Sequence, residues 1–388
     1  MSAVNLLDLA AFTASAEHDL FRELRGSSGL YFNPEPDGAG FWSAVRYCDV
    51  EQAARQHTIF ISGEGTQIKN RRAEGHGAPS VHNSDLPIHG KLRAIVMPGL
   101  SRSAVEKRSE QFADIVDALL ADVPRGEVSD YVEKIAIRLP MLVIAAMLGV
   151  PDDEAPLLVD WANLMSDVRA TNEEQAEARA HLFEYFRGLA DQKRNANADD
   201  IASLLVQAKL NDAPLEQQML DAYFMLLTVA GNETTRFLMT GGLAQLVRQD
   251  DWPKLRDTPG LIPSAIEEMC RFVSPVTHMR RTASQDTELA GQKICKGDKL
   301  VLWFASANRD EAVFADPDKL VLDRSPNPHM GFGIGAHFCL GTHLARFETK
   351  LFFEALARQV QQIELCEAPE RLPSNWFTGW TKMMVRFS

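Results

Sequence analysis

The sequence predicts a mainly helical fold with small β-sheets, of the α+β class, formed by one domain that spans residues 1–388. Three observations lead to this prediction. Helical periodicity dominates the chain, strand-like runs are few and far apart, and no Pro- or Gly-rich stretch is long enough for an interdomain linker. A chain of 388 residues with 45% hydrophobic composition can also bury a large core.

Three helices are predicted most clearly. Residues 139–149 are apolar on nearly all sides and stop at Gly149 and Pro151, which indicates a fully buried helix. Residues 173–194 are charged and amphipathic, which is typical of a surface helix. Residues 215–248 are rich in apolar side chains. If unbroken, that last helix would extend roughly 50 Å at 1.5 Å per residue and could cross a whole domain.

Strands are predicted at residues 40–45, 299–304 and 382–387, where β-branched and aromatic residues gather. These runs are far apart in the sequence, so any sheet that joins them is small and non-local. Trp303 and Phe304 are expected to belong to the core.

Charge and cysteine content narrow the possible functions. A net charge of −13 argues against nucleic acid as a partner, because phosphate binding needs a basic surface. No stretch reaches the roughly 18 apolar residues of a membrane span, and the N-terminus lacks a secretory signal pattern. The five cysteines contain no close zinc-type pair, so a zinc site is not expected. Their odd number and scattered positions, without a signal peptide, favour a reducing, cytoplasmic location without disulfides. Four of them are expected to be small buried hydrophobes: Cys48, Cys270, Cys295 and Cys366.

Cys339 differs from these because it lies in a glycine-rich stretch, Phe-Gly-Ile-Gly-Ala-His-Phe-Cys-Leu-Gly, over residues 332–341. The glycines predict a tight turn, and a helix-like run begins at Thr342. Backbone N–H groups and the helix dipole at such an N-terminus are expected to lower the pKa of the thiol. A thiolate held in this way is suited to bind a metal from one side.

This stretch closely resembles the haem-binding loop of the cytochrome P450 family, and the resemblance extends from about Asp19 to the C-terminus. It implies the cytochrome P450 fold, with the haem between a long central helix and the cysteine loop. It further implies that Cys339 is the proximal ligand of the iron of haem b. Phe332 and Gly341 of the loop would contact the haem.

A polar segment, Ala-Gly-Asn-Glu-Thr-Thr at residues 230–235, interrupts the long apolar helix. An acid beside a hydroxyl is unfavourable there unless it is hydrogen-bonded or faces water, so a solvent-facing polar patch is the alternative. The segment resembles the oxygen-binding helix of the family. That resemblance implies that Thr234 hydrogen-bonds the oxygen-derived group on the iron, that Glu233 relays protons through water, and that Ala230 contacts the haem.

Buried haem propionates need cationic or donor partners. By the same resemblance these would be His89, Arg93, Arg281 and His337. His89 and Arg93 share one helical face at the spacing i, i+4, although a surface position for His89 is the alternative. The sequence before His89 departs from the usual family motif.

Glu268 and Arg271 are spaced i, i+3 on a predicted helix, a pattern that is usually a solvated pair. Their surroundings match the structural ion pair of the family, which supports the cysteine loop. We therefore expect these two residues to have a structural role and no catalytic one.

The substrate pocket is predicted from position alone, and plain core packing is the alternative for each residue. The segments expected to surround it are the loop at about 61–88, the stretch at about 161–172, the helical turn that ends at Ala230, residues 276–279 and residues 376–378. Their bulky, mostly neutral side chains indicate an apolar substrate. The individual residues proposed are Val276, Thr277, Met279 and Phe377.

The predicted function is hydroxylation of an apolar small molecule (a terpenoid, a steroid or lipid, or an aromatic) with O2 and electrons from NAD(P)H. No dinucleotide fingerprint or ferredoxin-like cysteine set is present, so we expect no flavin or NAD(P) on this chain. A ferredoxin and its reductase would supply the electrons. One alternative is a peroxide-driven peroxygenase, and another is a non-catalytic haem sensor or carrier. Glu233 and Thr234 argue against both.

A local basic cluster near the cysteine loop is the predicted docking site for an acidic ferredoxin. An ordinary surface with scattered charges is the alternative. The residues of the cluster are Lys91, Arg102, Lys107, Arg108 and Arg346.

Overall fold

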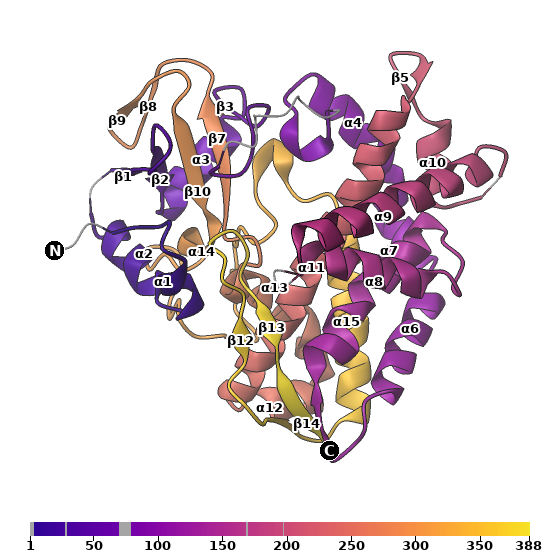
Figure 1. Cartoon of the computed structure of the whole chain (residues 1–388). Helices are drawn as coiled ribbons and strands as arrows, with labels where there is room; N and C mark the ends of the chain where they lie inside the picture. Colours follow the sequence, from indigo (N-terminus) through magenta and orange to yellow (C-terminus); the bar gives the residue numbers. More distant parts are fainter. Residues whose placement is uncertain (1–3, 28, 70–78, 168–169, 197) are drawn as a thin grey trace.

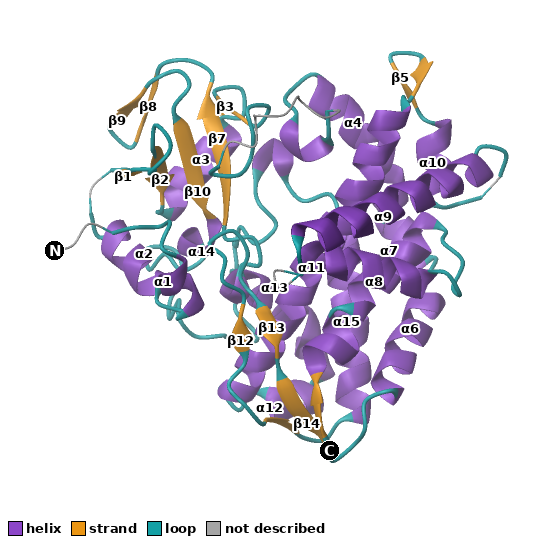
Figure 2. Cartoon of the chain, in the orientation of Figure 1, coloured by secondary structure: helices purple, strands orange, loops and turns teal. Residues whose placement is uncertain are grey.

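The computed structural model describes residues 4–27, 29–69, 79–167, 170–196 and 198–388. Helices make up most of it, and the strands are short, so the predicted fold class is confirmed (Figure 2). The α-helices are α1 (Leu9–Thr13), α2 (Glu17–Arg25), α3 (Tyr47–Arg55), α4 (Ile88–Val96), α5 (Arg102–Glu106), α6 (Ser109–Ala121), α7 (Arg138–Leu148), α8 (Ala155–Ser166), α9 (Asn172–Lys193), α10 (Ile201–Gln207), α11 (Gln217–Arg248), α12 (Trp252–Asp257), α13 (Ile262–Val273), α14 (Phe304–Ala307) and α15 (Thr342–Gln359).

In the part of the chain that the structure describes, five short helical turns are of the 3-10 or π type. They are η1 (Val81–Asn83), η2 (Met97–Leu100), η3 (Val132–Ala136), η4 (Pro259–Leu261) and η5 (Gly335–His337). None of the helices among the described residues is long and apolar enough to cross a membrane.

The three predicted helices are α7, α9 and α11. Helix α7 is buried along most of its length and ends where Gly149 adopts a left-handed conformation, with φ of 73°, as glycine does readily. Helix α11 runs unbroken for 32 residues through the middle of the molecule (Figure 1).

Two glycines explain how α11 packs so closely against its neighbours. A Cβ at Gly231 would lie 2.6 Å from Cδ1 of Ile144 on α7. A Cβ at Gly242 would lie 2.6 Å from Sδ of Met269 on α13. The helix-propensity penalty of a glycine, about 1 kcal/mol relative to alanine, is therefore offset by close contacts between helices.

The largest sheet has five strands in the order β1-β2-β10-β7-β3 and lies to one side of the helices α6 to α11 (Figure 1). Strand β10 runs parallel to β2 and antiparallel to β7. The strands of this sheet are β1 (Tyr31–Asn33), β2 (Phe41–Ala44), β3 (Phe60–Ile61), β7 (His278–Ala283) and β10 (Lys299–Trp303). Trp303 and Phe304 are buried, as predicted.

The remaining sheets have two or three strands. The predicted strand at 382–387 is interrupted at Met383, whose N–H donates to the side chain of Asp130. The strands are β4 (Val128–Asp130), β5 (Lys209–Leu210), β6 (Ala213–Pro214), β8 (Thr287–Leu289), β9 (Gln292–Ile294), β11 (Ile363–Leu365), β12 (Glu370–Arg371), β13 (Trp380–Lys382) and β14 (Met384–Phe387).

The predicted ion pair between Glu268 and Arg271 forms on α13, and both residues are fully buried. The Arg271 guanidinium donates to Glu268 at 2.7 and 2.8 Å and also to the carbonyl of Asn308. Arg324 donates to the same carboxylate at 3.0 Å. The pair thus fastens α13 to the irregular segment that leads to the cysteine loop, and Arg324 is a third member that the sequence had not indicated.

Candidate active site

The glycine-rich stretch forms the tight turn that its sequence predicts. Gly333 and Gly335 adopt φ of 69° and 76°, values that favour glycine. The Cys339 N–H donates to the Phe332 carbonyl at 2.9 Å, which closes the loop. Helix α15 then begins at Thr342, so Cys339 lies just before a helix N-terminus.

The Cys339 thiol does not have the lowered pKa expected from its sequence context. Burial by the surrounding protein raises the pKa, and the opposing effects of the Gly341 N–H and the charges of Arg93 and Arg346 only partly compensate. Yet the residue is solvent-accessible. Both observations are satisfied if the thiol faces a recess within the protein rather than its outer surface. The helix terminus assists the thiolate as predicted, but desolvation outweighs it.

The other four cysteines are free, and only one matches its prediction. Cys270 is buried, but Cys48 and Cys295 are exposed and Cys366 is partly exposed. The expectation of small buried hydrophobes is therefore wrong for three of them. Cysteine is buried often enough to favour that prediction, but Cys48 lies on an exposed position of α3, and Cys295 and Cys366 directly follow strands β9 and β11.

The four predicted propionate partners come together in space. The imidazole rings of His89 and His337 stack with centroids 4.1 Å apart. Burial, followed by the charges of Arg281, His89 and Arg93, lowers the pKa of His337 to about 3. Arg281 lies in β7, and burial lowers its pKa to about 10. Burial also lowers the pKa of Arg93, and the nearby Cys339 acts in the opposite direction.

This cluster has the properties that a bound dianion requires. Among the described residues, the buried Nε2 of His89 has no hydrogen-bond partner. The buried Arg281 guanidinium hydrogen-bonds the carbonyl of Arg280 and forms no salt bridge within the described ranges. A buried guanidinium without a hydrogen-bonded anion is unfavourable. Two carboxylates of a haem would satisfy these groups, and Cys339 would supply the iron ligand, so the residues fit the cofactor.

Helix α11 contributes the predicted polar segment. Ala230 is exposed although it lies in the middle of a 32-residue helix, which indicates that this turn borders an open space. Thr234 donates its hydroxyl to the Ala230 carbonyl at 2.8 Å, which fixes its rotamer. One turn further on, an amino group of Arg236 lies 3.6 Å from the Glu233 carboxylate, and both side chains are largely buried. The polar segment is therefore an internal feature and not a solvent-facing patch.

Glu348 is a buried acid near this segment that the sequence analysis did not single out. It lies on α15, accepts a hydrogen bond from Thr235 of α11, and burial raises its pKa well above the usual range. The regular spacing of apolar residues on α15 contains no signal for it, because only the three-dimensional packing places α11 over this position.

The predicted substrate residues lie on two segments that meet. Val276 and Phe377 form an isolated antiparallel bridge, and the Phe377 ring lies 6.0 Å from that of Phe237 on α11. Met279 is partly buried. Thr277 is fully buried and its hydroxyl lies 3.0 Å from that of Thr378, so in this structure it packs in the interior. The predicted pocket walls at 70–78 and 168–169 lie outside the described residues.

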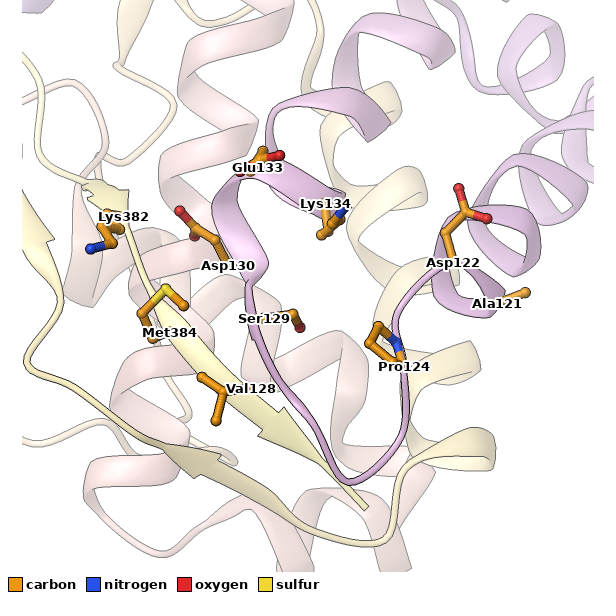
Figure 3. Close-up of a pocket in the computed structure, with 10 residues that line it drawn as sticks. All are labelled: Ala121, Asp122, Pro124, Val128, Ser129, Asp130, Glu133, Lys134, Lys382 and Met384. Carbon is orange, nitrogen blue, oxygen red and sulfur yellow. The ribbon is translucent and has the colours of Figure 1, made fainter.

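A separate cleft of about 730 Å³ lies between the end of α6, the turn η3 and strands β4 and β14 (Figure 3). It contains none of the predicted site residues. Its lining residues are Ala121, Asp122, Pro124, Val128, Ser129, Asp130, Glu133, Lys134, Lys382 and Met384.

The five bases of the predicted docking cluster all have partners within the chain. Arg102 pairs with Glu106 and Lys107 with Asp199. Arg346 pairs with Glu267 at 2.6 Å. Lys91 donates to the side chain of Asn211, and Arg108 to the carbonyls of Ala104 and Asp199. Three of the five charges are thus compensated by carboxylates, which weakens the electrostatic argument for docking.

Comparison with known proteins identifies the family. The family model for cytochrome P450 matches residues 258–361. The linalool 8-monooxygenase of Pseudomonas putida is 36% identical, and the alignment covers 96% of each chain. The methyl-branched lipid omega-hydroxylase of Mycobacterium tuberculosis is 36% identical over 98% of this chain and 94% of its own. The structure of a cytochrome P450 of Mycobacterium marinum in complex with pseudoionone superposes with a TM-score of 0.90 at 32% identity, covering 100% of this chain and 99% of that one.

The chain therefore belongs to the cytochrome P450 family. It is a monooxygenase of the bacterial type, and the family implies a haem-thiolate cofactor.

Proposed function

We propose that this enzyme hydroxylates an apolar small molecule at a haem b whose iron is ligated by Cys339. The observation that carries the proposal is the arrangement around the loop. One accessible thiol lies within the electrostatic influence of Arg93, and Arg93, His89, Arg281 and His337 gather in a cluster that needs an anion.

Cys339 and the four residues of this cluster would bind different parts of the haem. Cys339 would hold the iron, and His89, Arg93, Arg281 and His337 would bind the two propionates through charge-assisted hydrogen bonds. The haem, when bound, supplies activation of O2 next to the substrate. Cys339 and the propionate partners would fix the orientation of the cofactor.

The residues of α11 would manage protons. The Thr234 hydroxyl is held by the Ala230 carbonyl, so its oxygen remains free to accept a further hydrogen bond. Glu233 is a largely buried carboxylate one position earlier, with Arg236 close by. An acid and a hydroxyl in this position can take protons from water and deliver them to a defined point, as general acid–base catalysis requires. The same pair argues against a peroxide-driven enzyme, which needs no proton delivery, and against a passive haem carrier.

The proposed substrate is apolar: a terpenoid, a steroid or lipid, or an aromatic. Two relatives are named for linalool and for a methyl-branched lipid, both mostly hydrocarbon. The partly buried rings of Phe377 and Trp376, 4.4 Å apart, offer an apolar wall of the kind that such ligands favour, and the buried Phe237 ring packs behind Phe377.

The proposed electron source is NAD(P)H, through a ferredoxin and its reductase, because no flavin- or dinucleotide-binding motif was found in the sequence. We further propose that residues 1–388 act as one cytochrome P450 domain and that the protein works in the cytoplasm.

The test is the spectrum of the reduced protein with carbon monoxide. The wild type should show the band of a thiolate-ligated haem, and Cys339→Ser should lose or shift it. Cys48→Ser, a change at an exposed cysteine, is the matched control and should leave the band unchanged. Titration with linalool and with a branched fatty acid should then perturb the haem spectrum of the wild type. A normal thiolate band in Cys339→Ala would refute the assignment.

A further inference from the structure

The carboxylate of Asp85 clamps two loop residues that lie far from it in the sequence. Its two oxygens accept the N–H groups of Ser62 at 2.7 Å and Gly63 at 2.8 Å. Hydrogen bonds to a charged acceptor are among the stronger ones in proteins. The fit is tight, because a Cβ on Gly63 would lie 2.6 Å from the carboxylate oxygen Oδ2 of Asp85.

The clamped residue Ser62 leads directly to the haem-propionate cluster. Ser62 is fully buried, and its hydroxyl lies 3.2 Å from Nε2 of His337. The His337 ring in turn stacks on His89. A continuous chain of contacts thus joins Asp85 to two of the predicted propionate partners.

The backbone of Asp85 also contacts the first turn of α4. Its carbonyl accepts the N–H of His89 at 2.9 Å, so its backbone fixes the first turn that carries His89. Its negative charge acts on both His89 and Arg281, in the direction that favours their charged forms. Asp85 therefore acts on three predicted propionate partners. Its backbone carbonyl binds His89, its carboxylate holds the loop that contacts His337, and its charge acts on His89 and Arg281.

From these contacts we infer that Asp85 is a positioning residue of the haem-propionate site, which acts through Ser62 to orient His337. Asp85 does not itself contact the cofactor, since one carboxylate would repel another. Its role is to hold the loop at Ser62 and Gly63 against His337, so that the donors are preorganised. The inference rests on the proposed function, because it assumes that His89 and His337 face a haem.

A purely structural role for Asp85 is the competing explanation, and the chain offers a matched control for it. Asp130 also caps two backbone groups, because its Oδ1 accepts the N–H of Val132 at 2.9 Å and of Met383 at 3.0 Å. It lines the cleft of Figure 3, whose lining includes none of the predicted site residues. Asp130→Ala should therefore lose a comparable clamp without any effect on haem retention.

The experiment measures haem release from the full-length holoprotein into excess apomyoglobin, followed in the Soret band. Asp85→Ala should release haem about tenfold faster than the wild type, a factor that corresponds to about 1.4 kcal/mol. Asp85→Asn keeps one acceptor and should be intermediate. Ser62→Ala leaves the backbone clamp intact but removes the contact with His337, and it too should accelerate release. Gly63→Ala keeps every charge, but its Cβ would displace the Asp85 carboxylate, so this variant should also release haem faster than the wild type.

The outcomes separate the explanations. If Asp85→Ala and Ser62→Ala release haem at the wild-type rate, or if Asp130→Ala accelerates release as much as Asp85→Ala, the inference is overturned. If Asp85→Ala does not fold, Ser62→Ala and Asp85→Asn decide the question. If the wild type shows the thiolate band and the variants release haem at the wild-type rate, the role of Asp85 is overturned but the proposed function is not. A wild type that binds no haem overturns the proposed function as well.

Discussion

The Thr235 hydroxyl on α11 donates a hydrogen bond to the buried carboxyl of Glu348 on α15. This contact joins the helix that carries Glu233 and Thr234 to the helix that follows the cysteine loop. The second carboxyl oxygen of Glu348 has no hydrogen-bond partner within the described part of the chain. Such a position favours the neutral acid over the carboxylate.

Glu348→Gln should therefore become more stable than the wild type as the pH rises, because the glutamine side chain does not titrate. The pKa of Glu348 is raised in the folded state, so the unfolded chain releases this proton near its ordinary pKa while the folded chain keeps it. The wild type then loses stability as the pH rises above about 4.5, by at most about 1.4 kcal/mol per pH unit. Urea unfolding of both proteins between pH 5 and 8 measures the difference. A constant difference across this range would contradict a buried, protonated Glu348.

Glu267→Gln should have the opposite pH dependence. Burial disfavours the Glu267 carboxylate, but hydrogen bonds from His329 and Arg346 and the charge of Arg346 outweigh it and lower its pKa to about 2. The stability from this group is present above pH 4.5 and is lost as the pH falls toward 2. Since about a third of the Glu267 side chain is exposed, we expect a contribution on the order of 2 kcal/mol at pH 7.

Acid unfolding of Glu267→Gln checks this prediction. The variant should be less stable at pH 7, and its stability should fall less steeply than that of the wild type between pH 4.5 and 2. Parallel curves for the two proteins would mean that Glu267 is not held ionised by its neighbours.

Thr234→Ala should divert reducing equivalents from product to hydrogen peroxide. The variant loses the hydroxyl that is held at the Ala230 carbonyl, so protons are no longer delivered to a defined point. Thr234→Ser keeps the hydroxyl and is the matched control. The ratio of hydroxylated product to NAD(P)H consumed should fall in the first variant and stay near the wild-type value in the second. An unchanged ratio in Thr234→Ala would remove Thr234 from the proposed proton pathway.

Arg271→Met should destabilise the fold by roughly 3–5 kcal/mol, because it leaves the fully buried Glu268 carboxylate with fewer partners. Arg102→Met, which breaks an exposed pair with Glu106, is the control and should barely change the unfolding midpoint. Chemical denaturation of the two variants compares them. An equal loss of unfolding free energy in the two variants would show that burial does not determine how much an ion pair contributes to stability.

Electron transfer should respond to charge reversal at Arg102, although less strongly than a free base would suggest, because Glu106 already compensates it. Arg102→Glu should raise the Michaelis constant for a ferredoxin and leave the substrate dissociation constant unchanged. The effect should shrink as salt rises, since the Debye length falls to about 3 Å at 1 M. Arg386→Glu, on strand β14, is the control. If the Michaelis constant for the ferredoxin changes neither with salt nor in Arg102→Glu, the ferredoxin docks elsewhere or through apolar contacts.

The sequence predicted those elements whose structure depends on residues close to one another in the chain. The glycines around Cys339, the apolar run of α7 and the long apolar stretch of α11 each determine their own structure through neighbours in the chain. The i, i+3 spacing placed Glu268 and Arg271 on one helical face, but their structural ion pair was predicted from the family resemblance of the surrounding residues.

Contacts between distant segments were not predictable in the same way. Nothing near Asp85 in the sequence points to Ser62, and nothing near Glu268 points to Arg324. The raised pKa of the Cys339 thiol also depends on burial by several elements, so the helix terminus alone gave the wrong direction. Arg346 was expected to be free for a partner, but α13 supplies Glu267. The roles of the site residues remain predictions until the variants above are measured.

The glycine contacts of α11 limit how this enzyme can diverge. At Gly231, Gly241 and Gly242 a single added methyl group would meet a side chain of α7 or α13 at 2.6 to 2.8 Å. Mutational drift along these faces is therefore restricted to changes that neighbouring helices can accommodate together. New substrate preferences should arise instead in the segments predicted to surround the pocket, such as residues 376–378, where a substitution does not require an entire helix to move. Libraries for altered specificity should accordingly spare the glycines of α11 and vary those segments.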